Sequence, residues 1–301
     1  MAKSRIEWTE ETWNPVTGCS KYSEGCRNCY AERMHKRLTA MGQQKYSKPF
    51  NEVIFHKNEL SNHKFSRLDT KRKMIFVNSM SDTFHKDISD YNIQEILNEC
   101  EWNDPNIFQI LTKRAERLPN FTYPHNVWLG VTVENAEYKN RIDYLKQTNA
   151  PIKFLSCEPL LGDIGELDLT GINWVIVGGE SGPHARPINA EWVLNILHQC
   201  EKQNVPFFFK QWGEWLPAKY NPFSKSGYTA ILKDEAKEKY KLACYPFDFL
   251  KKKYKIHIWP GETLSGKPIN ISVRVGKNKA GSMIGLKEYK EFPAIPELKE
   301  I

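Results

Sequence analysis

The stretch Met74-Ile-Phe-Val-Asn-Ser-Met-Ser-Asp82 contains the pattern that decides the fold, a short apolar run that leads directly into polar side chains. β-Branched and aromatic residues favour strands, so the run predicts a buried strand that ends where the polar residues begin. A less certain first strand lies near Trp13–Thr17. Similar runs predict further strands at Ile107–Leu111, Val127–Val133, Ile152–Ser156, Trp174–Val177 and Pro206–Phe209.

Segments with helical periodicity separate the predicted strands. Apolar residues recur there every three or four positions, as Ile93, Ile96 and Leu97 do, which predicts helices with one face in the core. Strands and helices that alternate about every 20 to 35 residues predict a parallel β/α sheet. The predicted helices cover residues 31–41, 88–101, 135–147 and 190–203.

Polar residues follow nearly every predicted strand. In a β/α barrel the carboxyl ends of the strands meet at one mouth, where active sites are built, whereas an open sheet spreads them along an edge. We therefore expect an α/β fold in which parallel strands form a partial or full (β/α) barrel. The barrel is predicted for residues 1–216, and a small basic C-terminal extension for residues 217–301.

Three cysteines, Cys19, Cys26 and Cys29, lie within eleven residues, between the first predicted strand and the first predicted helix. Three soft thiolates suit a transition-metal centre. One interpretation is a [4Fe-4S] cluster with one iron open to a chelating molecule such as S-adenosyl-L-methionine. A second is a structural zinc site that His35 completes, and a third is ordinary reduced thiols. The cysteine spacing favours a metal and leaves cluster and zinc open.

The composition describes a basic chain of 301 residues with a formal net charge of +7, which favours an anionic partner such as nucleic acid. Seven cysteines, an odd total, come without a secretory leader, so we expect no disulfide framework and a cytoplasmic location. No apolar run approaches the roughly 20 residues that a membrane-spanning helix needs. These features predict a protein without membrane partners.

Candidate cofactor contacts follow the second and third predicted strands. Asn78, Ser79, Ser81 and Asp82 offer donors and acceptors suited to an amino acid moiety, with helix capping as the alternative. Lys113 and Arg114 could hold a carboxylate or a phosphate, or they could form a solvated charge pair at a helix start.

Candidate catalytic groups are carboxylates that follow later strands, where they could bind ribose hydroxyls or move protons. Basic and aromatic side chains near the last predicted strand could bind nucleic acid, the cations at phosphates and the indoles stacked on a base. A lysine-rich stretch at residues 233–255 could add to that contact or be a solvated face. The carboxylates are Glu134, Glu158 and Glu180, and the nucleic-acid candidates are Arg186, Lys210, Trp212 and Trp215.

Several motifs together resemble a phage-associated family of unknown function with a three-cysteine motif, which is itself similar to radical S-adenosylmethionine enzymes. The resemblance implies a partial (β/α) barrel, a [4Fe-4S] cluster on Cys19, Cys26 and Cys29, S-adenosyl-L-methionine as a cofactor and an electron donor as a partner. The motifs are Trp13-Asn14-Pro15, Cys-x6-Cys-x2-Cys, Ser79-Met80-Ser81-Asp82, Leu111-Thr112-Lys113-Arg114, Glu158-Pro159-Leu160-Leu161-Gly162, Gly178-Gly179-Glu180-Ser181 and Phe209-Lys210-Gln211-Trp212-Gly213.

The cysteine spacing departs from the commoner radical pattern, in which three and then two residues separate the cysteines and an aromatic precedes the third. Here six residues separate the first two cysteines, and Asn28 precedes Cys29. We expect an iron-sulfur protein that acts on a nucleotide or nucleic acid. The alternative is a zinc-containing nucleic-acid-binding module without catalysis, followed by a carboxylate hydrolase that uses Glu158 and Glu180.

Overall fold

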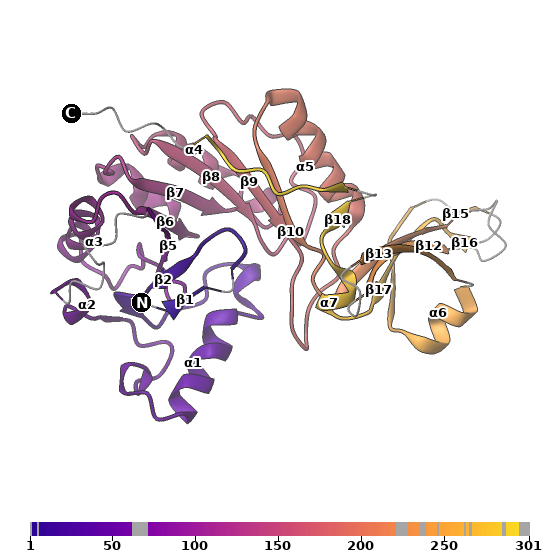
Figure 1. The fold of residues 1–301 in the computed structure, drawn as a ribbon, viewed down its shortest axis with the longest axis horizontal. Coiled ribbons are helices and arrows are strands. Elements are labelled where there is room, and N and C mark those ends of the chain that lie inside the picture. Colours follow the sequence, from indigo (N-terminus) through magenta and orange to yellow (C-terminus); the bar gives the residue numbers. More distant parts are fainter. Residues whose placement is uncertain are drawn as a thin grey trace. The chain divides into compact units, whose positions relative to one another are not determined.

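The computed structural model describes residues 2–4, 6–61, 72–220, 228–234, 239–245, 247–261, 263–264, 267–284 and 287–294 (Figure 1). The chain divides into two compact units. Unit 1 comprises Met1–Val133, Tyr138–Ser156 and Gly171–Asn173, and unit 2 comprises Glu134–Glu137, Cys157–Thr170 and Trp174–Ile301.

Unit 1 contains parallel strands whose order in the sheet follows their order in the chain, β2-β5-β6-β7-β8, with β1 added antiparallel at the β2 edge. Nearly every residue of β6, β7 and β8 is buried, as expected for strands that are covered on both faces. The strands are β1 (Ala2–Lys3), β2 (Glu11–Trp13), β5 (Met74–Val77), β6 (Ile107–Thr112), β7 (Val127–Thr132) and β8 (Ile152–Cys157).

Helices and short connections link these strands. Ser89 caps α3 (Asp90–Trp102), which buries Ile93, Ile96 and Leu97 on the predicted face. The predicted helix at 135–147 is instead the 3-10 turn η4 (Ala136–Tyr138) followed by α4 (Asn140–Lys146). The remaining elements are β3 (Val16–Thr17), η1 (Glu24–Cys26), α1 (Tyr30–Ala40), η2 (Gln44–Tyr46), β4 (Ile54–Phe55), α2 (Asn58–Ser61) and η3 (Ala115–Asn120).

Unit 2 contains a parallel β-α-β segment formed by β9 (Trp174–Gly178), α5 (Ala190–Gln203) and β10 (Phe207–Gln211). An antiparallel sheet follows in the order β13-β12-β11-β17-β14. Its strands are β11 (Trp215–Tyr220), β12 (Tyr228–Asp234), β13 (Lys239–Tyr245), β14 (Ile256–Ile258) and β17 (Asn270–Arg274). The other elements are α6 (Phe247–Lys253), β15 (Thr263–Leu264), β16 (Lys267–Pro268), α7 (Lys277–Ala280), β18 (Met283–Ile284) and β19 (Lys287–Glu288).

The predicted fold class is confirmed, because parallel strands follow one another through β-α connections as they do in a partial β/α barrel. The prediction of a first strand near Trp13–Thr17 is corrected. Only Glu11–Trp13 joins the parallel strands, and Val16–Thr17 pairs with β4 instead. Pro15 lies between the two and has no backbone N–H for a ladder.

The boundary predicted after residue 216 stays a prediction. Within the C-terminal extension, the predicted lysine-rich stretch at 233–255 is described except for residues 235–238 and 246. Among the helices that the structure describes, none combines the length and the apolar character that crossing a membrane requires.

Candidate functional site

The cysteine loop, residues 18–29, begins at a backbone position that only glycine accommodates. Gly18 has a φ of +80°, and a Cβ there would lie 2.1 Å from the carbonyl oxygen of Glu52. The next residue, Cys19, donates its N–H to the carbonyl of Phe50 at 2.7 Å. At the other end of the loop, Cys29 is the N-cap residue of α1. Local backbone geometry therefore fixes both ends of the loop.

The three thiols of the loop are free and half-buried. Burial and the Asp82 carboxylate raise the pKa of Cys19 to about 12, against the lowering effect of Arg114. Burial also raises the pKa of Cys29, and the backbone N–H groups of Glu32 and Ala31 act in the opposite direction. Cys26 and Cys29 both raise the pKa of Cys19, so the thiols lie within electrostatic reach of one another. The thiols of Cys19 and Cys29 are therefore protonated near neutral pH, and a bound metal centre would have to replace their protons.

The donor set of the loop is three cysteine thiols, which suit a soft metal centre. Among the described residues, no group of three or more His, Cys, Asp or Glu side chains could hold one metal ion. In an iron-sulfur cluster each thiolate would bind a different iron. Three thiols in one loop match the ligands expected for a cluster that has one iron without a protein thiolate.

His35, the predicted fourth zinc ligand, lies on α1 and is buried. Its ring packs edge-on against Tyr46 and Phe50, with centroids 5.5 and 5.4 Å away, and Thr39 Oγ1 lies 3.5 Å from its Nδ1. Burial lowers its pKa. These contacts are those of a core histidine, so they do not support the zinc interpretation.

The loop after β5 forms hydrogen bonds with residues 14–18, the segment that leads into the cysteine loop. Asn78 has a φ of 59°, and its Oδ1 accepts the Val16 N–H at 2.9 Å. Ser79 Oγ donates to Asn14 Oδ1 at 3.1 Å, and Ser81 Oγ donates to the Gly18 carbonyl at 2.5 Å. These three predicted cofactor contacts therefore form hydrogen bonds with residues 14–18. Whether any also touches a cofactor stays a prediction.

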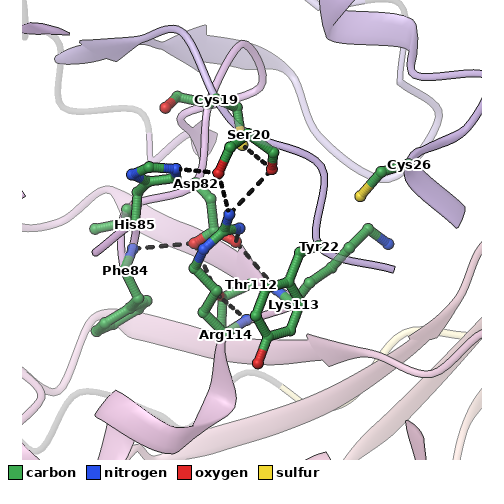
Figure 2. Close-up of polar contacts among 12 residues, drawn as sticks. Cys19, Ser20, Tyr22, Cys26, Asp82, Phe84, His85, Thr112, Lys113 and Arg114 are labelled. Atoms are coloured by element: carbon green, nitrogen blue, oxygen red, sulfur yellow. Dashed lines mark hydrogen bonds and ion pairs between the residues drawn. The ribbon is translucent and has the colours of Figure 1, made fainter. Parts of the chain in front are cut away.

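Asp82 and Arg114 form a buried ion pair at the carboxyl ends of β5 and β6 (Figure 2). Asp82 Oδ2 accepts from Arg114 Nη1 at 3.4 Å and from the Lys113 N–H at 3.2 Å. Asp82 Oδ1 accepts from Thr112 Oγ1 at 2.7 Å and from the Phe84 N–H at 3.0 Å. The carboxylate, predicted to contact a cofactor, thus receives four protein donors.

Arg114 extends from this pair to the cysteine loop. Its Nη2 donates to the carbonyl and to the hydroxyl of Ser20, each at 3.0 Å. Its guanidinium carbon lies 4.7 Å from the ring centroid of Tyr22, whose hydroxyl donates to Glu116 at 3.1 Å. The residue after Cys19 is therefore bound to the end of β6. Lys113, the other predicted cation, is half-buried.

Ser20 also contacts His85, with 2.7 Å between Ser20 Oγ and His85 Nε2. The Asp87 N–H donates to His85 Nδ1 at 3.2 Å, so the neutral ring carries its proton on Nε2 and donates to Ser20. Burial, reinforced by Arg114, lowers the pKa of His85 and favours this neutral form. With its proton on Nε2, His85 is not a base for Ser20, and the contact anchors the loop.

The predicted catalytic carboxylates of unit 2 pair with predicted phosphate-binding cations. Glu158 Oε1 lies 3.0 Å from Lys210 Nζ. Glu180 binds Arg186 through both carboxylate oxygens, at 2.7 and 3.0 Å, and also accepts the Arg186 N–H at 2.8 Å. The third carboxylate, Glu134, is fully buried. Two of the predicted catalytic carboxylates therefore form ion pairs with two of the predicted nucleic-acid-binding cations.

Trp212 and Trp215, predicted to stack on a base, are buried. Trp212 Nε1 donates to the Met283 carbonyl at 2.8 Å, and Trp215 Nε1 donates to the Ala185 carbonyl at 2.7 Å. Buried indoles with their N–H groups satisfied have a packing role. Their contact with nucleic acid stays a prediction that this burial does not support.

Sequence reasoning did not select Ser20, Tyr22, His85 and Thr112, although all four belong to the network around Asp82 and Arg114. Ser20 and Tyr22 lie between the first two cysteines, and that position was the available signal. Thr112 lies in the Leu111-Thr112-Lys113-Arg114 motif after the third predicted strand, whereas His85 carries no comparable signal, because its role depends on a contact with a distant segment.

A family model described as a protein of unknown function, DUF5131, matches residues 3–293. The chain belongs to this family. The DUF5131 chain has no match among the curated proteins.

Solved structures similar to the DUF5131 chain include spore photoproduct lyase complexed with dinucleoside spore photoproduct, at 10% identity and a TM-score of 0.39. A cysteine-to-serine mutant of that lyase matches at 11% identity with a TM-score of 0.42. A double mutant with bound AdoMet and dinucleoside spore photoproduct matches at 11% and 0.39. Each match covers 83% of this chain and 72% of the other. TM-scores in this range do not establish a common fold.

Proposed function

We propose that this DUF5131 protein holds a [4Fe-4S] cluster on Cys19, Cys26 and Cys29 and uses it with S-adenosyl-L-methionine in a reaction on a nucleotide or nucleic acid. The observation that carries the proposal is the set of three half-buried thiols in one short loop, residues 18–29. Soft thiolates at this density are typical ligands of iron-sulfur clusters.

When bound, the cluster would supply an electron to S-adenosyl-L-methionine at the iron that lacks a thiolate. The chain itself would contribute the thiolate ligands and their orientation. The first N–H groups of α1 favour an anionic sulfur at Cys29, and the backbone contacts of Gly18 and Cys19 fix the start of the loop. An electron donor is required as a partner.

The anionic substrate class is supported by the net charge of +7 and by Lys251, Lys252 and Lys253, which are exposed in the last turn of α6. Among the candidates for contact with the reacting molecule in unit 2, the side chains of Lys210 and Arg186 are each 23% exposed and that of Glu158 is 14% exposed. Glu134, Glu180 and Lys113 also stay proposed site residues, and the cytoplasmic location and the phage association stay proposals.

The test of the metal centre is anaerobic purification followed by iron, sulfide and zinc analysis. We expect about four irons and four sulfides per chain, with loss of both when Cys19, Cys26 and Cys29 are changed to Ala. Cys100→Ala, which removes a buried thiol of α3, is the matched control and should retain the iron. Zinc in place of iron, even after reconstitution with iron and sulfide, would contradict the proposal.

A second measurement addresses the substrate class. Fluorescence anisotropy with a labelled single strand should give an affinity that falls as salt rises, because cations that neutralise phosphates release counterions on binding. Replacing Lys251, Lys252 and Lys253 together by Gln should weaken binding and reduce the salt slope. Binding that is independent of salt would contradict an electrostatic contact with phosphates.

A further inference from the structure

The loop around Cys19 is held by three segments that are distant from it in sequence. Ser81 Oγ binds the carbonyl of the residue before Cys19, the Phe50 carbonyl binds the Cys19 N–H, and Arg114 binds the carbonyl of the residue after it. The peptide group before Cys19 and the one after Ser20 are therefore anchored. Cys26 and Cys29 lie instead on η1 and at the start of α1, where helical backbone bonds fix them.

Arg114 is the central member of these anchors. Its guanidinium joins the Asp82 carboxylate, the Ser20 carbonyl and the Ser20 hydroxyl, and it lies against the ring of Tyr22 (Figure 2). The residue is only 5% exposed. A planar guanidinium can serve several acceptors in fixed directions, which an ammonium cannot do.

From this arrangement we propose that Arg114 and Asp82 are positioning residues that set Cys19 in its place before any cofactor binds. The inference rests on the proposed function, because it assumes that Cys19 is a cluster ligand. It also changes the role expected for the pair. Protein groups occupy the Asp82 carboxylate and the Arg114 guanidinium, so the pair acts on a cofactor through the cysteine loop and makes no contact with a cofactor carboxylate.

The test measures how fast each thiol of the cluster-free, full-length protein reacts with iodoacetamide over a range of pH, so that exposure is compared separately from the change in thiol pKa that loss of Arg114 causes. The alkylated peptides are quantified by mass spectrometry. Arg114→Met should raise the rate at Cys19 about tenfold, because loss of the anchor increases the population of the open loop. The rates at Cys26 and Cys29 should stay within about twofold of their original values, since helical backbone bonds hold them. These two thiols are internal controls within each sample.

Two further variants separate positioning from general stability. Arg114→Lys keeps the charge beside Asp82 but cannot bridge the Ser20 oxygens, so Cys19 should still react faster than in the original protein. Ser20→Ala leaves the buried ion pair intact and should fold, with a smaller increase at Cys19 than Arg114→Met gives. Full restoration of the original Cys19 rate by Arg114→Lys would show that only charge balance matters and would overturn the proposal.

Equal acceleration at all three cysteines in Ser20→Ala, or no change at Cys19 in any variant, would also overturn it. The measurement needs no cluster, so its outcome is independent of the iron analysis. A protein that binds no iron but shows selective exposure of Cys19 would refute the proposed function and leave the positioning role of Arg114 in place.

Discussion

Ion pairs with a buried carboxylate occur in both units, but they connect different parts of the chain. In unit 1 the Asp82–Arg114 pair joins residues 32 positions apart, and Arg114 then reaches Ser20, a further 94 positions away. In unit 2 Glu180 and Arg186 are six positions apart and bind within one loop. The first pair ties distant segments to a thiol-bearing loop, and the second shapes its own turn. Removing a partner should therefore disturb the candidate metal centre in unit 1 and only local structure in unit 2.

The largest effect is expected for Arg114→Met. Removal of one partner from a buried pair leaves an uncompensated charge and should cost about 3–5 kcal/mol in the free energy of unfolding. Both side chains are less than a tenth exposed, at 6% and 8%, which places the pair in this class. Urea unfolding of the purified protein gives the measurement.

Arg117→Met is the comparison for Arg114→Met, because Arg117 lies on η3, the 3-10 helix that follows Arg114, and pairs with Asp90, which is 70% exposed. Its ion pair should contribute about 1 kcal/mol or less. Loss of its hydrogen bonds to the Phe84 and His85 carbonyls adds to this cost, which should stay below that of Arg114→Met. Equal losses in the two variants would mean that burial of the Asp82–Arg114 pair does not distinguish it.

A smaller effect is expected at the local pair of unit 2. Glu180→Gln should cost about 1–3 kcal/mol, because the buried carboxylate loses the charge that three donors share. A double-mutant cycle with Arg186→Met should give a coupling energy above about 0.5 kcal/mol. Additive losses in the free energy of unfolding would show that the two side chains act independently, so that Arg186 could bind a phosphate.

The sequence predicted where the polar residues gather, but it did not predict what they bind. The positions of Asn78, Ser81, Asp82 and Arg114 follow from strand ends, since strands are visible as apolar runs. The partners of Asn78, Ser81 and Arg114 are backbone groups of Val16, Gly18 and Ser20, more than 60 residues away in each case. No local pattern encodes such pairings, so cofactor contact and loop anchoring look identical in sequence.

Side chains with an apolar body and a polar tip gave a second kind of ambiguity. Trp212 and Trp215, near the last predicted strand, and His35, shortly after Cys29, were interpreted from their positions as groups open to a ligand, and the structure buries all three. An indole or imidazole suits a core as well as a surface, and long-range packing decides between them. The cysteine loop was easier to recognise, because three closely spaced thiols are rarely needed for packing alone.

Acid should destabilise unit 1 more than unit 2. Burial lowers the pKa of His35, His56 and His85 in unit 1 and of His257 in unit 2 from the ordinary value of 6.5. The unfolded chain then binds protons that the folded chain does not bind. The contribution of these histidines to the free energy of unfolding is therefore complete above about pH 6.5 and falls as the pH drops toward their lowered pKa values. Hydrogen exchange followed by mass spectrometry, between about pH 7 and pH 5, should show earlier opening of unit 1.

The variant His35→Phe sharpens this expectation, because phenylalanine keeps the edge-on contacts with Tyr46 and Phe50 but does not titrate. It should reduce the acid sensitivity of unit 1, and His257→Phe should leave unit 1 unchanged. Parallel opening of both units at every pH would remove the predicted difference between them.

The smallest effect on stability is expected for the partly exposed pair in unit 2. Glu158 and Lys210 are 3.0 Å apart but 14% and 23% exposed, so either Glu158→Gln or Lys210→Met should cost about 1 kcal/mol or less. Because these variants lose little stability, a change in their nucleic-acid binding or turnover would reflect function and not unfolding. If the pair contacts substrate, each variant should lose nucleic-acid binding or turnover while thermal unfolding stays nearly constant. Retention of both properties would assign the pair to packing against Gly178, where an added Cβ would lie 2.7 Å from Glu158 Oε1.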